Sequence, residues 1–193
     1  MRTSSALFTF ALCTAASTSA QALGSFGVRL GTGMTLSDPE PKAGAEEPKA
    51  GAEEPTPIVA GLAYRIDLIV VGVEADLLFH RFSFDKGTED RLALPVIVNG
   101  SLPLVPGFVA LNFGAGLEPR FLIGADDNGV DISDDRKSMV MYLPISVGAE
   151  LDLQVVKGML DIRYERQLTP HFKGKPNEDH RAHEVLVMAG VFL

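Results

Sequence analysis

The segment 69–84, IVVGVEADLLFHRFSF, alternates between two kinds of side chain. The apolar positions of one parity are Val71, Val73, Ala75, Leu77 and Phe79. The opposite parity is small, charged or polar apart from one leucine, and consists of Gly72, Glu74, Asp76, Leu78 and His80. A period of two predicts a β-strand, here longer than the usual length of about 5–6 residues. Such a strand suits either a half-buried soluble sheet or a membrane barrel with its apolar face toward lipid.

Seven further segments alternate in the same way, so we expect strands at 26–36, 58–65, 69–84, 91–101, 108–123, 139–153, 158–167 and 183–193. The connections after the first, third, fifth and seventh strands are long and polar, whereas those after the second, fourth and sixth are short. Outer-membrane barrels show this asymmetry between external loops and periplasmic turns. The predicted fold class is therefore all-β, an eight-stranded antiparallel up-and-down transmembrane β-barrel. Pro95 lacks an N–H and is expected at a bulge or a weak part of the ladder.

The charged residues within the strands favour the membrane form of this barrel. They lie on the parity opposite to the large apolar residues, and we expect a structural charge network in the lumen made of Arg29, Glu74, Asp76, Glu118, Arg120, Glu150, Asp161, Arg163 and Glu165. The same parity is rich in glycine, which a narrow eight-stranded interior needs. Lysine, common on solvated strand edges, is absent from the strands as drawn. Because unpaired buried carboxylates are costly, paired charges should plug the lumen and leave no wide pore.

The alternative is a soluble, secreted, lipocalin-like β-barrel. In that arrangement the apolar parity would line a pocket for a small apolar ligand, and the charged parity would face water. The two alternatives therefore differ in which parity points inward.

Residues 1–22 are predicted to be a secretory signal peptide, which leaves 23–193 as the barrel domain. An apolar run over 6–16 suits an h-region, and Ala20-Gln21-Ala22 gives a small-x-small cleavage pattern. Cleavage would remove Cys13, the only cysteine, so no disulfide or thiolate metal site is expected. No later run of 18 apolar residues follows, so any membrane crossing would use strands. The net charge of −8 does not suggest a nucleic-acid partner.

Two polar segments are expected to be solvated loops. Residues 37–57 contain a tandem duplication of seven residues, 41–47 followed by 48–54. Residues 124–137 hold five aspartates: Asp126, Asp127, Asp131, Asp134 and Asp135. This second segment lacks the ligand spacing of a calcium loop.

Three motifs resemble the PorT-like outer-membrane β-barrel domain, whose broader relatives are OmpA- and OmpX-like eight-stranded barrels. They are Leu92-Ala93-Leu94-Pro95-Val96-Ile97-Val98, the strand 108–124 with Phe113-Gly114-Ala115-Gly116, and Leu160-Asp161-Ile162-Arg163-Tyr164-Glu165-Arg166-Gln167-Leu168. The resemblance covers about residues 24–193. It implies an integral outer-membrane protein with no shared catalytic residue. We expect a monomer that contacts outer-membrane lipid and lipopolysaccharide. The assembly machinery for such barrels would recognise the C-terminal strand, although this chain ends in Phe192-Leu193 rather than in Phe.

The sequence predicts no enzymatic activity and no cofactor. His80, Ser83 and Asp85 lie close together along the chain, but no nucleophile motif surrounds Ser83. Phosphate-loop and zinc motifs are absent from the sequence. The predicted role is structural, or an interaction of the external loops with a partner.

Overall fold

The computed structural model describes residues 24–36, 56–68, 71–83, 87–127, 129–169 and 183–193. Most of them lie in ten strands: β1 (Ser25–Leu36), β2 (Thr56–Leu68), β3 (Val71–Ser83), β4 (Gly87–Ala93), β5 (Val96–Val105), β6 (Val109–Asp127), β7 (Val130–Asp131), β8 (Met139–Asp152), β9 (Lys157–Gln167) and β10 (His183–Phe192). The predicted signal peptide and the tandem duplication lie outside the described residues.

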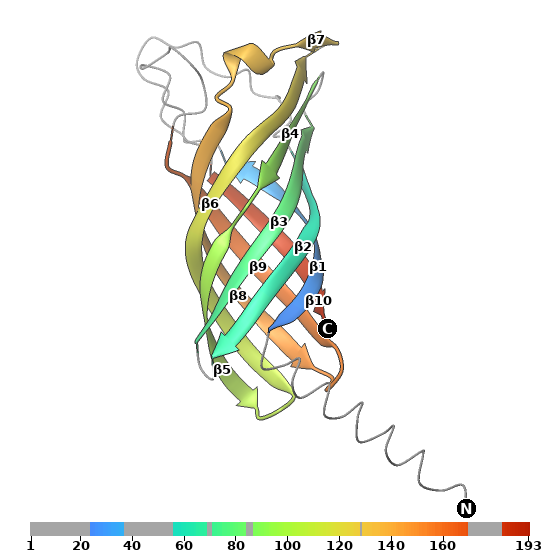
Figure 1. Ribbon diagram of the computed structural model, residues 1–193, viewed down its shortest axis with the longest axis vertical. Helices are drawn as coiled ribbons and strands as arrows, with labels where there is room; N and C mark the ends of the chain where they lie inside the picture. Colours follow the sequence, from blue (N-terminus) through green and yellow to red (C-terminus); the bar gives the residue numbers. More distant parts are fainter. Residues whose placement is uncertain (1–23, 37–55, 69–70, 84–86, 128, 170–182) are drawn as a thin grey trace, which may run out of the picture.

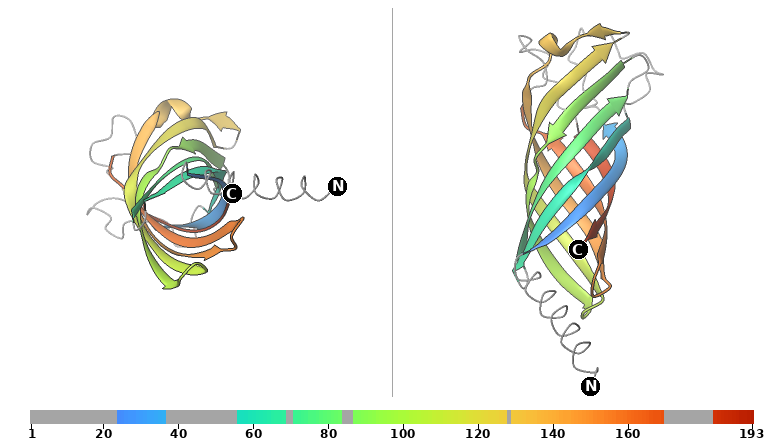
Figure 2. Two further views of the ribbon diagram at one scale, coloured as in Figure 1. Left: turned by 60° about the horizontal axis from the view of Figure 1, so that its bottom comes forward. Right: turned by 45° about the vertical axis from the view of Figure 1, so that its right-hand side comes forward.

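The strands close into a single antiparallel barrel. Each long strand pairs with its neighbours along the chain, and β10 pairs with β1, with Phe192 opposite Gly27. β4 and β5 together occupy one position between β3 and β6. The barrel therefore has eight strand positions, which we call staves. Figures 1 and 2 show these tilted staves around a common axis. The predicted closed, eight-stranded, antiparallel up-and-down β-barrel is confirmed.

Pro95 interrupts the fourth stave, as its missing N–H predicts. Leu94 and Pro95 separate β4 from β5. The backbone N–H of Leu94 donates to the carbonyl of Pro119, and that of Asp76 donates to the carbonyl of Pro95, both at 3.0 Å. These two bonds continue the backbone hydrogen bonding to β6 and β3 between the end of β4 and the start of β5, so the barrel wall stays closed there.

The prediction of a plain acidic loop over 124–137 was wrong. β6 continues to Asp127 and pairs with β4, then with β7. A short 3-10 helix follows at Ser133–Asp135. The backbone N–H of Ser133 donates to Asp131 Oδ1 at 2.9 Å, and the hydrogen bonds from Ser133 hold the pKa of Asp131 below its ordinary value. Local hydrogen bonds therefore order a segment whose composition alone suggested a loop.

The two faces of the wall differ sharply in chemistry. Large apolar side chains point outward, and Leu62, Val98 and Ile162 are each more than half exposed. The interior holds charged side chains together with a few apolar ones, including the cluster Val59, Leu78, Ala93, Leu186 and Met188. The apolar parity thus lies outside, which excludes the lipocalin-like alternative with an apolar pocket. No helix among the described residues is long and apolar enough to cross a membrane.

Glycine lets neighbouring staves approach closely. A Cβ on Gly61 would lie 2.0 Å from the carbonyl oxygen of Leu77, and one on Gly116 would lie 2.0 Å from that of Val96. Both contacts are with backbone, so any larger residue would push the staves apart. The glycine-rich parity therefore permits the narrow lumen.

Candidate functional site

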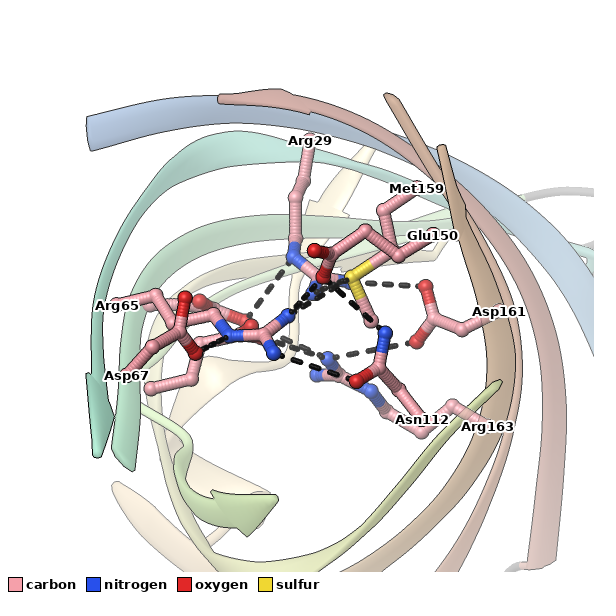
Figure 3. A network of polar contacts seen from close by, with 10 residues as sticks. Arg29, Arg65, Asp67, Asn112, Glu150, Met159, Asp161 and Arg163 are labelled. Carbon is pink, nitrogen blue, oxygen red and sulfur yellow. Dashed lines mark hydrogen bonds and ion pairs between the residues drawn. The ribbon is translucent and has the colours of Figure 1, made fainter. Parts of the chain in front are cut away.

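The charged side chains that converge in the lumen form the candidate site. The inward parity of each strand brings them to the axis, because alternate residues of a stave point into the barrel. They form two buried clusters and a partly exposed group near the β2–β3 and β8–β9 turns. Figure 3 shows part of the first cluster and the turn-side group, with Arg29 from β1 and Arg163 from β9 both reaching the carboxylate of Asp161.

The first cluster consists of Arg29, Arg163, Glu74, Asp76 and Asp161. Arg29 donates through Nη2 to Glu74 Oε1 at 2.6 Å and through Nη1 to Asp161 Oδ1 at 2.9 Å. Arg163 Nη2 lies 3.4 Å from Asp76 Oδ2 and 3.7 Å from Glu74 Oε1. These contacts tie three staves, β1, β3 and β9, together across the lumen. The side chains are at most 1% exposed, so water screens these charges little.

The second cluster gathers three carboxylates around one guanidinium. Arg120 Nε donates to Glu118 Oε1 at 2.5 Å, Nη1 donates to both carboxylate oxygens of Glu184 at 3.0 and 2.9 Å, and Nη2 donates to Glu165. The Arg120 guanidinium also lies 3.8 Å from the centroid of the Tyr142 ring. All four charged side chains are at most 1% exposed. Three carboxyl groups therefore share one guanidinium in this cluster.

The turn-side group joins β2 to β8. Arg65 donates through Nε to Asp67 Oδ1 at 2.6 Å and through Nη1 to Glu150 Oε2 at 2.8 Å. Asn112 donates to the same oxygen of Glu150 at 3.2 Å. Lys157 lies 3.8 Å from the other Glu150 oxygen. This group covers the turn end of the interior, opposite the end that carries β7.

The structure distributes the nine predicted network residues over all three groups. Arg29, Glu74, Asp76, Asp161 and Arg163 meet in the first cluster; Glu118, Arg120 and Glu165 meet in the second; Glu150 pairs with Arg65 near the turns. The first cluster and the turn-side group are connected, because Met159 Sδ accepts from Arg29 at 3.3 Å and from Arg65 at 3.8 Å.

Several interior residues were missing from the predicted set: Arg65, Glu89, Arg91, Asn112, Tyr142 and Glu184. Each lies on the inward parity of its strand, so parity alone would have found them. Arg91 donates to Glu89 at 2.5 Å and forms another charged layer nearer the β7 end. The predicted set had been limited to mid-strand charges, which excluded residues near strand ends.

His80 and Ser83 do not come together. His80 is completely buried in the lumen, 3.8 Å from Glu118 Oε1, whereas Ser83 is exposed on the outer face of the same strand. Asp85 lies outside the described residues. Over the described part of the chain, no three His, Cys, Asp or Glu side chains are grouped so that they could hold a metal ion.

Comparison with known proteins supports the architecture. No family model and no curated protein matches the chain. Among solved structures, Neisserial surface protein A aligns with a TM-score of 0.59 at 13% identity, covering 88% of this chain and 96% of that one. The outer membrane enzyme PagL aligns with a TM-score of 0.56 at 9% identity, covering 85% and 97%. The N-terminal β-barrel domain of Pseudomonas aeruginosa OprF aligns with a TM-score of 0.48 at 10% identity, covering 88% and 99%. At these identities the likeness to the first two structures establishes the fold alone, a closed eight-stranded β-barrel.

The prediction that the chain has no enzymatic activity is corrected by this comparison. PagL is an outer membrane enzyme on a similar barrel, so the fold is compatible with catalysis. The prediction rested on missing linear motifs. On a barrel, residues far apart in sequence meet across adjacent staves, and a linear search does not detect such groupings.

Proposed function

We propose that the chain is an integral outer-membrane barrel whose lumen is closed by charged side chains. The observation that carries the proposal is that apolar side chains cover the outside of the barrel while charged side chains fill its interior, the reverse of a water-soluble protein. Val98 is 55% exposed on the outer wall, while Arg163 and Glu118 are completely buried inside. Water-soluble proteins rarely expose a continuous apolar belt of this kind, whereas a lipid-facing wall requires one.

The proposed physiological role is structural, or an interaction at the external surface. β6, β7 and the 3-10 helix extend the wall at the end opposite the short turns (Figure 1). In the proposed orientation this extension faces the exterior and offers backbone and acidic side chains to a partner. The resemblance to the PorT-like domain remains a prediction within this proposal.

The proposed partners follow from the same orientation. Lipid and lipopolysaccharide would surround the outer wall, and the assembly machinery would act through β10, which closes the barrel against β1. Phe192 at the end of β10 points inward and packs with Ala63 and Met159. We propose a monomer, because the eight staves leave no unpaired long strand for a second copy to extend.

Cell fractionation tests the proposed location. We expect the protein to be recovered with outer membranes and to migrate differently on gels before and after boiling, because a closed barrel resists detergent until it is heated. A periplasmic protein expressed in the same cells serves as the control for leakage. Release with the periplasmic contents would refute the proposal.

Planar-bilayer recordings test the closed lumen. We expect no stable porin-like current from the reconstituted protein, because the first and second clusters place paired charged side chains across the axis. A porin reconstituted by the same procedure supplies the positive control. Large, stable currents from the wild-type barrel would contradict a plugged lumen while leaving the membrane location intact.

A further inference from the structure

The outer wall carries a hollow over β6, β8 and β9. It is formed by two neighbouring rows of outward-facing residues, each row paired across the three strands. One row is Phe113–Val147–Ile162 and the next is Ala115–Ile145–Tyr164. Ala115 is small beside its larger neighbours. The six residues, together with Gly114 and Ser146, line a hollow of about 530 Å³. Small-molecule sites are commonly about 300–1,000 Å³.

A polar edge adjoins this hollow. The Tyr164 hydroxyl and His183 Nδ1 are 2.5 Å apart, and the two rings stack at 5.8 Å between centroids. Arg166, the next outward residue of β9, pairs across the sheet with Leu143 on one side and His183 on the other. Apolar and cationic surface therefore lie next to each other on one face.

Arg166 is exposed, and it makes no hydrogen bond or ion pair with any other residue that the structure describes. Arg81, also exposed on the outer face, differs in this respect. It donates to both carboxylate oxygens of Asp90 at 2.8 and 2.7 Å. Among the residues that the structure describes, Arg81 is thus neutralised by an aspartate, whereas Arg166 has no carboxylate partner.

The height of Arg166 along the wall suits a lipid head group. Eight residues separate it from Gly158 at the turn end of β9. At about 3.3 Å per residue and a tilt of about 40°, this corresponds to roughly 20 Å along the barrel axis. The apolar band of such barrels is about 25 Å tall, so the guanidinium lies near its external border.

We propose that this face binds one lipid of the outer leaflet whose phosphate-bearing head group is anionic overall, with an acyl chain in the hollow and the phosphate against Arg166 and His183. The inference rests on the proposed membrane location. Charge complementarity carries it, because an unpaired arginine at the edge of an apolar wall is stabilised by an anionic head group. The hollow at Ala115 provides apolar contact directly beside the cation.

Native mass spectrometry of the purified, detergent-solubilised barrel titrated with lipid A tests the proposal. We expect one bound lipid A and much weaker binding of phosphatidylcholine, whose head group has no net charge. Arg166→Gln should weaken lipid A binding at least about tenfold, the effect of one lost charge-assisted contact. Arg81→Gln is the matched control and should bind as the wild type does.

A second pair of variants tests the hollow. Ala115→Phe should fill it and weaken lipid A binding by a similar factor, while Ala75→Phe, on the outer face of β3 away from the hollow, should have no effect. Wild-type affinity in both Arg166→Gln and Ala115→Phe would overturn the proposal, as would equal binding of phosphatidylcholine. Insertion of the wild-type barrel into phosphatidylcholine vesicles is measured separately. Its failure would refute the membrane location itself, whereas insertion without selective lipid A binding would refute only the lipid site.

Discussion

Arg120→Met should destabilise the folded barrel by about 3–5 kcal/mol, the usual cost of removing one partner of a buried ion pair. The substitution leaves Glu118, Glu165 and Glu184 facing one another without their shared cation. Methionine keeps much of the side-chain volume, so the expected loss comes from charge rather than from a cavity. Urea unfolding of the barrel in lipid vesicles, followed by the heat-dependent gel shift, measures the change.

Two further variants make the Arg120 test decisive. Arg81→Met removes an exposed ion pair, which typically contributes about 0–1 kcal/mol, and should leave stability nearly unchanged. Combining Arg120→Met with Glu118→Gln, Glu165→Gln and Glu184→Gln should recover part of the loss, because no buried charge then remains in the second cluster. Wild-type stability in Arg120→Met alone would show that the second cluster does not hold the barrel together.

Leu77→Arg should cost about 2–4 kcal/mol and impair insertion into lipid, as expected for a cation at the bilayer midplane. Leu77 is at the middle of β3, is 43% exposed, and pairs with Leu62 on the adjacent stave. In water an exposed leucine tolerates arginine, so the cost arises only if lipid surrounds this wall. Refolding yield into vesicles and urea unfolding measure the effect.

Ser83→Arg is the matched control for Leu77→Arg. Ser83 lies on the same outer face of the same strand, six residues nearer the external end. A cation near the membrane interface costs only about 0–1 kcal/mol. Equal stability and equal insertion of Leu77→Arg and Ser83→Arg would argue against a lipid-facing wall.

Strand number and parity could be predicted from the sequence because both are local. Each stave alternates along its own length, so Val71 and Glu74 were assigned to opposite faces without knowledge of any neighbour. Pro95 marked the break in the fourth stave through its missing N–H. The extension of β6 to Asp127 was missed because its polar residues gain their order from hydrogen bonds to β4, β7 and Ser133.

The partners of the charged residues could not be predicted from the sequence. Arg29 and Asp161 are 132 positions apart, and they meet at 2.9 Å only because β10 lies between β1 and β9 in the closed sheet. Which carboxylates share Arg120 depends in the same way on register between distant strands.

The alternation of side chains by itself determined eight strands, each with large apolar residues on one face and small or charged residues on the other. Only the tertiary structure decided that the charged face is the inner one and which charged residues meet there. The physical reason is that parity is a property of one strand, whereas closure is a property of the whole sheet. Once β10 pairs with β1, each arginine of the two buried clusters must lie against carboxylates from other staves, because the lumen offers these charges little water.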